Sequence, residues 1–272
     1  MADIWIAVVQ GIVEGLTEFL PISSTGHLIL SGHLLGFTGD KAETFEIVIQ
    51  LGAILAVALL YWRRLLRLIG WEDPSYEKQS NKSLTLIHIF LAIVPAMLLG
   101  LLMHGLIKDY LFTPQTVLIG LVVGGFFMIF AERKHTIVIA KTMDELSYRQ
   151  AFQIGIAQCL ALWPGFSRSG ATIAGGLLSG ANLRTSADFS FLIAVPMMVA
   201  ATSYDLMKNM GHLSMDDLSF FLVGFIVSFI VALLAVVSFL KLLEKVKLSS
   251  FAYYRFILAG VFWLYMVGIG LD

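Results

Sequence analysis

Charged side chains are scarce in this sequence, which excludes most water-soluble folds. Only 14% of its 272 residues are charged and 58% are hydrophobic, whereas soluble domains carry about 25% charged residues. The formal net charge of −1 provides no basic surface field, so we expect no nucleic-acid partner. A single cysteine, Cys159, is too few for an intrachain disulfide or a multi-cysteine metal site. The composition therefore predicts a protein that faces membrane lipid.

Several short signatures are also missing. The sequence contains no G-x-x-x-x-G-K-[ST] phosphate loop, no H-E-x-x-H zinc helix and no G-x-S-x-G nucleophile elbow. Its first residues, Met1–Ile6, lack the positive charge of a secretory signal, so we expect them to belong to the mature fold. Any chemistry must come from a different arrangement of residues.

Long apolar runs are abundant, and a helix needs about 20 mostly apolar residues to cross a membrane. Two stretches, 1–40 and 150–183, are apolar but broken at Pro21–Gly26 and Pro164–Gly170 by residues that end helices. Their pieces are too short to span, so we expect two re-entrant helical hairpins. The predicted fold is an all-α polytopic membrane protein with these hairpins and six transmembrane helices, at 44–62, 84–103, 116–131, 186–204, 218–238 and 251–268.

Basic residues are distributed unevenly among the segments that connect these helices. The loops 63–83, 132–149 and 239–250 hold five, four and three Lys or Arg residues, whereas 104–115 and 205–217 hold one each. The positive-inside rule places the first three loops in the cytoplasm. We therefore expect both ends of the chain on the outer side.

The chain also repeats itself. A gap-free shift of 144 residues aligns Ser23 with Ser167 and Gly26 with Gly170, at the two breaks. Chance matching between apolar segments is the alternative. Three spans in each half would turn the second half upside down, which gives an inverted-topology repeat. We expect one membrane domain over 1–272, with repeat 1 at about 1–131 and repeat 2 at about 145–268.

The first hairpin carries carboxylates at helical spacing. Gln10, Glu14 and Glu18 recur every four residues and therefore share one helix face. An ionised carboxylate at membrane depth costs about 2.5–3.5 kcal/mol on insertion scales. These acids should face a cation, a metal ion or a polar cavity, or share a proton, unless they lie in interfacial water.

Hydroxyl residues and a histidine follow the break. We expect the hydroxyls of Ser23, Ser24 and Thr25 to cap the returning helix, with His27 in its first turn. The free N–H groups of a helix start favour an anion. This half of the hairpin therefore predicts a polar site rather than a plain turn.

The second hairpin carries Arg168 at its break. A guanidinium inside a membrane is costly unless it meets an anion, and its fork matches phosphate oxygens. The hydroxyls of Ser167, Ser169 and Thr172, with the amides of a helix start, would complete an oxyanion cradle. The alternative is a structural ion pair with an acid of the first hairpin.

With these residues in view, the sequence resembles the bacterial undecaprenyl-diphosphate phosphatases, the BacA family linked to bacitracin resistance. The resemblance runs end to end and rests on Glu14-Gly-Leu-Thr-Glu-Phe-Leu-Pro-Ile-Ser-Ser-Thr-Gly-His27 and Pro164-Gly-Phe-Ser-Arg-Ser-Gly-Ala-Thr172. It implies hydrolysis of undecaprenyl diphosphate to undecaprenyl phosphate and inorganic phosphate, which recycles the lipid carrier of cell-wall polysaccharide synthesis. It also implies a divalent cation, Mg2+ or Ca2+, and a site in the bacterial cytoplasmic membrane that opens to the outer face.

The resemblance also assigns roles by motif position. The attacking group stays open among His27, Ser24 and water, and Glu14 and Glu18 would hold the cation or position water. The implied catalytic residues are Glu14, Glu18, Ser24, His27 and Arg168, and the implied phosphate-binding residues are Ser23, Thr25, Ser167, Arg168, Ser169 and Thr172.

Two other functions compete with this one. Inverted repeats with broken helices are typical of transporters, so a transporter or flippase of a phosphate-bearing lipid or anion is the main alternative. A lipid phosphatase of the acid type-2 class is weaker, because Thr172 stands where that class needs histidine. The expected partners are the isoprenoid diphosphate substrate and membrane lipid. The sequence leaves the oligomeric state open, with a homodimer among the options.

Overall fold

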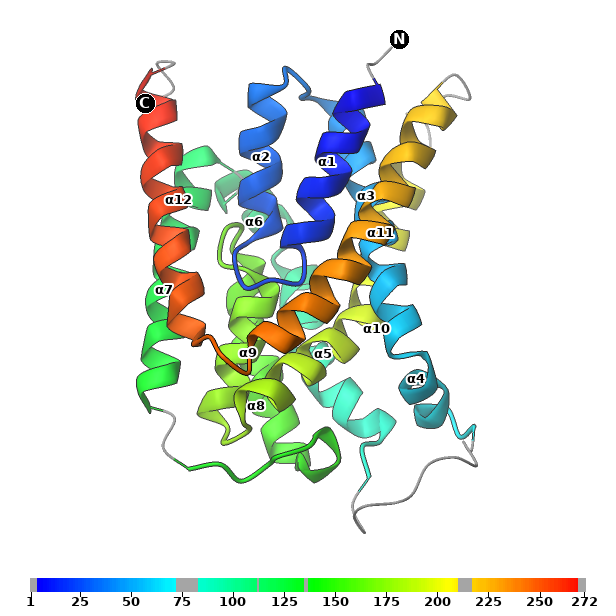
Figure 1. Cartoon of the computed structure of the whole chain (residues 1–272), viewed down its shortest axis with the longest axis vertical. Coiled ribbons are helices and arrows are strands. Elements are labelled where there is room, and N and C mark those ends of the chain that lie inside the picture. The colour runs from blue at the N-terminus through cyan, green and yellow to red at the C-terminus, as the bar shows by residue number, and fades with distance from the viewer. Residues whose placement is uncertain (1–3, 72–82, 112, 135–136, 210–216, 269–272) are drawn as a thin grey trace.

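Helices make up almost all of the regular structure (Figure 1). The computed structural model describes residues 4–71, 83–111, 113–134, 137–209 and 217–268. Within these ranges the only pairing between extended segments is an isolated bridge from Ala140 to Ala181. Lys78 and Lys82, which contributed to the predicted orientation, lie outside the described residues. The all-α prediction is confirmed.

Five described helices are long and apolar enough to cross a membrane, and they fall on five of the six predicted spans. The sixth, predicted at 84–103, is α5 (Leu86–Leu102), an apolar helix of 17 residues. Such a helix measures about 26 Å, slightly less than the ~30 Å hydrocarbon core. The chain is therefore a multi-pass membrane protein, and the sixth crossing stays a prediction. The five are α3 (Asp40–Leu60), α7 (Pro114–Lys134), α10 (Leu183–Asn209), α11 (Leu218–Leu242) and α12 (Leu248–Gly268).

Two segments predicted as plain loops contain short helices. These are α4 (Trp62–Leu68), which begins at the last residue of the predicted span 44–62 and continues into 63–83, and α6 (His104–Leu111), inside 104–115. The sequence of α4 is Trp-Arg-Arg-Leu-Leu-Arg-Leu, and Arg and Leu are both strong helix formers. The loop prediction was wrong here because these segments were delimited by their charged residues, without regard to helix propensity.

Both predicted hairpins form as pairs of short helices joined by a turn. The first consists of α1 (Ile4–Thr17) and α2 (Ser24–Leu34), whose turn lies near mid-height of the molecule in Figure 1. The second consists of α8 (Tyr148–Gln158), a 3-10 turn η2 (Cys159–Leu162) and α9 (Arg168–Leu178). Whether they re-enter a membrane is a prediction that the helices alone do not test.

The returning helices begin in the same way. Ser23 and Ser167, the residues just before α2 and α9, have φ angles of 71° and 74° and are the non-glycine residues with positive φ in the described chain. They are also the pair that the shift of 144 residues aligns. A positive φ is strained for serine, so its occurrence at both aligned positions supports the repeat, whose inversion stays a prediction.

Capping differs between the two hairpins. The Ser167 hydroxyl accepts a hydrogen bond from Gly170 N at 3.1 Å. Ser23 makes no side-chain cap, so the prediction that its hydroxyl caps α2 was wrong. The Ser23 carbonyl instead accepts from the ring of His27, which lies in the first turn of α2 as expected.

Each hairpin packs against a helix from the other half of the chain. In the first hairpin α1 packs on α11, and in the second α8 packs on α5. Glycine allows both approaches, because a Cβ atom at Gly11 would lie 2.8 Å from Gly224 O and one at Gly155 would lie 2.6 Å from Leu91 O. The two halves therefore interlock around the hairpins.

The helices that lead into the basic connecting segments end on the same side of the molecule. The C-terminal ends of α4, α7 and α11 lie in the lower half of Figure 1, whereas α12 ends at the top. Arg64 pairs with Asp144 at 2.7 Å, and Glu132 accepts from Leu248 N at 2.8 Å. The chain termini, 1–3 and 269–272, lie outside the described residues, so their predicted location is untested.

The largest buried apolar cluster lies against the hairpin turns. It joins Phe19 of the first turn to Ile173 of α9, Phe191 of α10 and Phe251 of α12. The Phe19 and Phe191 rings meet edge to face at 5.5 Å. This packing fixes the height at which the two turns face each other.

Candidate active site

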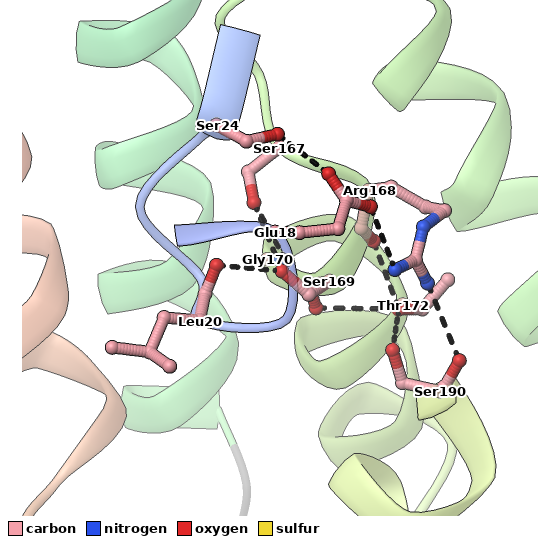
Figure 2. Close-up of polar contacts among 9 residues, drawn as sticks. All are labelled: Glu18, Leu20, Ser24, Ser167, Arg168, Ser169, Gly170, Thr172 and Ser190. Atoms are coloured by element: carbon pink, nitrogen blue, oxygen red, sulfur yellow. Dashed lines mark hydrogen bonds and ion pairs between the residues drawn. The ribbon is translucent and has the colours of Figure 1, made fainter. Parts of the chain in front are cut away.

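The two hairpin turns meet through an ion pair. Glu18, one residue after α1, lies 3.2 Å from Arg168 Nη2 through its Oε1 atom (Figure 2). Their side chains are 6% and 12% exposed, and Arg168 also lies over the Phe19 ring at 5.5 Å. A pair this buried is held more strongly than a surface ion pair, but it is also costly to desolvate. The structure therefore brings together the acid and the guanidinium that the sequence singled out.

Ser24 completes a short chain of contacts across the first turn. Its hydroxyl donates to Glu18 Oε2 at 2.6 Å, so Glu18 is held by Ser24 on one oxygen and by Arg168 on the other. A hydroxyl that donates to an oriented carboxylate has the geometry of a nucleophile beside a base. Thr25 follows in the first turn of α2, half-buried, and makes no side-chain hydrogen bond to another described residue.

Arg168 has further bonding capacity. Its Nη1 atom donates to Ser190 O on α10 at 3.3 Å, and its buried Nε atom has no partner among the described residues. A guanidinium carries five N–H donors in a planar fork. Arg168 therefore has donors left for an incoming anion.

The hydroxyls of the second turn are bound to protein atoms. Ser169 donates to Leu20 O of the first turn at 2.9 Å and lies 3.1 Å from the Ser167 hydroxyl. Thr172 donates to Arg168 O at 2.8 Å and also contacts the Ser190 hydroxyl. Ser169 and Thr172 are fully buried. In this arrangement they hold the turn, and their predicted phosphate contacts stay untested.

Glu14 lies one helical turn before Glu18 and is an exception to the rule that buried polar groups are paired. It is 1% exposed, and neither carboxylate oxygen has a hydrogen-bond partner among the described residues. Gln10, a further turn away, is equally buried and has an unpaired Nε2 atom. Glu14 therefore requires a proton or a cation.

A divalent cation fits this arrangement only with help from a ligand. No group of three or more His, Cys, Asp or Glu side chains suited to a metal occurs in the described part of the chain. Glu14 and Glu18 supply two carboxylates, and Mg2+ commonly uses one or two carboxylates together with substrate phosphates. Substrate oxygens would have to complete the coordination of any cation held here.

His27 is hydrogen-bonded at both ring nitrogens. Nδ1 lies 2.8 Å from Ser23 O, and Nε2 lies 2.7 Å from the hydroxyl of Tyr254 on α12. The ring is therefore already oriented without a ligand.

Three residues near the site were not predicted from the sequence. Arg255 is fully buried and donates to Gly165 O in the second turn at 2.8 Å and to Gly120 O at 3.0 Å. It lies inside the predicted span 251–268, so the rule that singled out Arg168 would have found it. Ser190 and Tyr254 carried no such signal, because serine and tyrosine are common in membrane helices.

Known proteins match this chain over nearly its whole length. The family described as "Bacitracin resistance protein BacA" matches residues 7–261. The chain is 59% identical over 267 residues to "Undecaprenyl-diphosphatase 1" of Bacillus cereus, covering 98% of this chain and 100% of that relative. It is 58% identical over the same shares to proteins of that name from Bacillus thuringiensis and Bacillus anthracis.

Proposed function

Because this chain belongs to the BacA family of bacitracin resistance proteins, we propose that it hydrolyses undecaprenyl diphosphate to undecaprenyl phosphate and inorganic phosphate. The observation that carries the proposal is the ion pair between Glu18 and Arg168 at 3.2 Å, which joins the two hairpins at one point. The relatives named above are undecaprenyl-diphosphatases by name, and none of them is named as a transporter. The transporter alternative therefore has no support from them.

Arg168 and the second turn would bind the terminal phosphate. The unpaired Nε of Arg168 and the amides that begin α9 would supply N–H donors for it. When the phosphate arrives, Arg168 would exchange Glu18 for phosphate oxygens. Glu18 Oε1 is then free to face a cation, while Oε2 stays on the Ser24 hydroxyl.

Ser24 is the attacking group that the geometry favours. Its Oγ would bond to the terminal phosphorus while its proton passes to Glu18 Oε2, 2.6 Å away. The bond from phosphorus to the bridging oxygen breaks, and undecaprenyl phosphate leaves. Water then hydrolyses the phosphoserine and releases inorganic phosphate. Phosphoryl transfer depends mainly on positioning and charge stabilisation, and both hairpins contribute to these.

His27 is less suited to attack phosphorus. Nδ1 is held by the Ser23 carbonyl and the Nε2 lone pair by the Tyr254 hydroxyl, so no lone pair is free to attack, whereas a protonated Nε2 can still give up its hydrogen. We propose that it acts instead as the acid that protonates the leaving lipid phosphate. Trapping a phosphorylated enzyme after rapid acid quench tests the choice, with phosphate expected on Ser24. Phosphate on His27, or no covalent phosphate at any turnover rate, would reject Ser24 as the nucleophile.

Glu14 and Glu18 would hold the divalent cation, Mg2+ or Ca2+, together with phosphate oxygens. Bound there, the cation would neutralise charge on the diphosphate. The unpaired carboxylate of Glu14 supports this assignment, because protein atoms alone leave it unsatisfied. Phosphate release should stop with a chelator and return with either cation. Full activity after exhaustive chelation would remove the cation from the mechanism.

The enzyme assay also separates the two candidate functions. Purified protein in detergent encloses no compartment, so transport is absent there. We expect inorganic phosphate to be released from farnesyl or undecaprenyl diphosphate in micelles. Failure of the wild-type chain to release phosphate with Mg2+ or Ca2+ would reject the enzyme function.

We further propose that the site opens to the outer face of the bacterial cytoplasmic membrane, within six crossings and two re-entrant hairpins arranged as an inverted repeat. The ends of α4, α7 and α11, which lead into the basic connecting segments and lie on one side of the molecule, support this orientation. In a Cys159→Ala background, Thr38→Cys beyond α2 should react with a membrane-impermeant maleimide on intact cells. Lys247→Cys, in the turn before α12, should react only after lysis. The opposite labelling pattern would invert the topology.

A further inference from the structure

A polar contact joins α2 to α12 beside the proposed site. His27 Nε2 and Tyr254 Oη lie 2.7 Å apart, and the two rings are parallel within 4° at a centroid distance of 5.7 Å. Tyr254 lies 227 residues from His27 in the chain and is 44% exposed. The contact therefore depends on α12, which packs on α7, lying close enough to α2 for the two side chains to meet.

The partners of His27 determine which nitrogen carries hydrogen. Nδ1 lies 2.8 Å from the Ser23 carbonyl, and a carbonyl can only accept, so Nδ1 must be the donor. In the neutral ring Nε2 then holds the lone pair, and the Tyr254 hydroxyl donates to it. When His27 is protonated, Nε2–H donates to the same hydroxyl oxygen instead.

From this geometry we propose that Tyr254 is a positioning residue for His27, an inference that rests on the proposed function. It fixes the rotation of the imidazole and marks Nε2 as the nitrogen that takes up a proton. When substrate is bound, Nε2–H would exchange the Tyr254 hydroxyl for the bridging oxygen of the leaving lipid phosphate and give its proton to that oxygen. Tyr254 acts through His27 and does not itself contact the reacting phosphorus.

The surroundings of Tyr254 support a fixed position. The next residue, Arg255, is 0% exposed and donates to Gly165 O in the second turn at 2.8 Å. Two consecutive residues of α12 thus contact the two hairpins. Tyr254 contacts the first hairpin and Arg255 contacts the second. A tyrosine at a membrane interface can also be a simple anchor. Its neighbour Tyr253 has that character, because it is 55% exposed and contacts the Phe256 ring without a hydrogen bond to another described residue.

The first measurement is turnover of farnesyl diphosphate in detergent by Tyr254→Phe, with Tyr253→Phe as the matched control. Removal of the hydroxyl keeps the ring but removes one hydrogen bond, so we expect kcat to fall about tenfold. The KM should stay within about twofold, because no substrate contact is lost. Tyr253→Phe should match the wild type. Circular dichroism and gel filtration check that both variants fold.

The second measurement needs no turnover. Diethyl pyrocarbonate modifies the free lone pair of a neutral imidazole, and peptide mass spectrometry follows each histidine separately. His27 should be modified at least about threefold faster in Tyr254→Phe than in the wild type, because Nε2 loses its donor. The exposed His33 serves as the internal reference and should be unchanged. In the wild type alone, His27 should react more slowly than His33, which gives a measurement that needs no variant.

The proposal requires both effects. Turnover of Tyr254→Phe equal to that of Tyr253→Phe would overturn it, and so would an unchanged modification rate at His27 accompanied by lost turnover. No phosphate release by the wild-type chain would reject the proposed function separately, and the labelling comparison would still decide whether Tyr254 holds His27.

Discussion

The first and second hairpins place different side chains at equivalent backbone positions. The shift of 144 residues sets Glu14 against Gln158 and Ser24 against Arg168, although α2 and α9 each follow a serine with positive φ. In the first hairpin the Glu14 carboxylate has no partner among the described residues. In the second, the hydroxyls of Ser169 and Thr172 are all bound to protein atoms.

This difference shows how one backbone plan can serve two roles. The second turn is preorganised, because its own hydrogen bonds fix the donors before an anion arrives. Both hairpins keep some bonding capacity that the described residues leave unmet, at the Glu14 carboxylate in the first and at Arg168 Nε in the second, but only the first carries acidic side chains. We therefore expect changes in the first hairpin to affect chemistry, and changes in the second to affect binding and shape.

The largest effect should come from Ser24→Ala, which removes the proposed nucleophile. We expect kcat to fall about 10³-fold or more, as for other residues that attack substrate directly. Ser31→Ala is the matched control on the same helix, because the Ser31 hydroxyl is bound to Gln10 Oε1 at 2.7 Å. It should keep activity near wild type. A Ser24→Ala enzyme with more than a tenth of normal turnover would break the assignment of chemistry to the first hairpin.

Arg168→Lys should reduce kcat/KM about 100-fold, because lysine keeps the charge but loses the planar fork that matches phosphate oxygens. Arg184→Lys is the control, since Arg184 forms an exposed pair with Asp188 at 3.0 Å away from the turn. Inorganic phosphate release and an unchanged helical circular dichroism spectrum would test this. Near-normal turnover of Arg168→Lys would remove Arg168 from the site.

Glu14→Gln should separate activity from stability. We expect activity to fall about tenfold and the concentration of Mg2+ or Ca2+ needed for half-maximal activity to rise, because one of two carboxylates is lost. In chelator, its thermal midpoint should be at or above that of the wild type, because a neutral amide is easier to bury than an unpaired carboxylate. A variant with lower stability and unchanged cation dependence would show that Glu14 has a structural role.

Thr172→Val should have the smallest effect. It removes the hydroxyl that bonds Arg168 O and Ser190 while keeping the shape of the side chain. We expect loss of about 1 kcal/mol of stability and a few-fold rise in KM with little change in kcat. A large fall in kcat alone would mean that the second hairpin also takes part in chemistry.

The sequence predicted the elements of the site better than its supporting contacts. Pro21, Pro164 and the Ser and Gly residues around them located both breaks, because these residues act locally on the backbone. Glu18 and Arg168 were found because charge is rare in an apolar chain. Their contact depends on how two distant segments pack, and the sequence left it open between an ion pair and a bound anion.

The side chains that α10 and α12 contribute to the site could not be predicted from local sequence features. Ser190 and Tyr254 reach the site because of how their long helices are rotated about their own axes, and hydropathy does not specify that rotation. The charge of Arg255 makes it detectable in an apolar span. The sequence does not indicate that Arg255 binds Gly165 O, which lies 90 residues away in the chain. The short helix α4 was missed because its basic residues were counted for orientation only.

The interlocking of α1 with α11 has a consequence for how the protein is made. The helix α1 ends at Thr17, and α11 begins at Leu218, about 200 residues later in synthesis. Until the ribosome has synthesised α11, the Gly11 face of the first hairpin has no helix packed on it. The acidic side chains of this hairpin are then not yet buried as they are in the complete fold. Completion of the catalytic half nearest the start of the chain must therefore be among the last events of assembly, and truncations before α11 should leave it inactive.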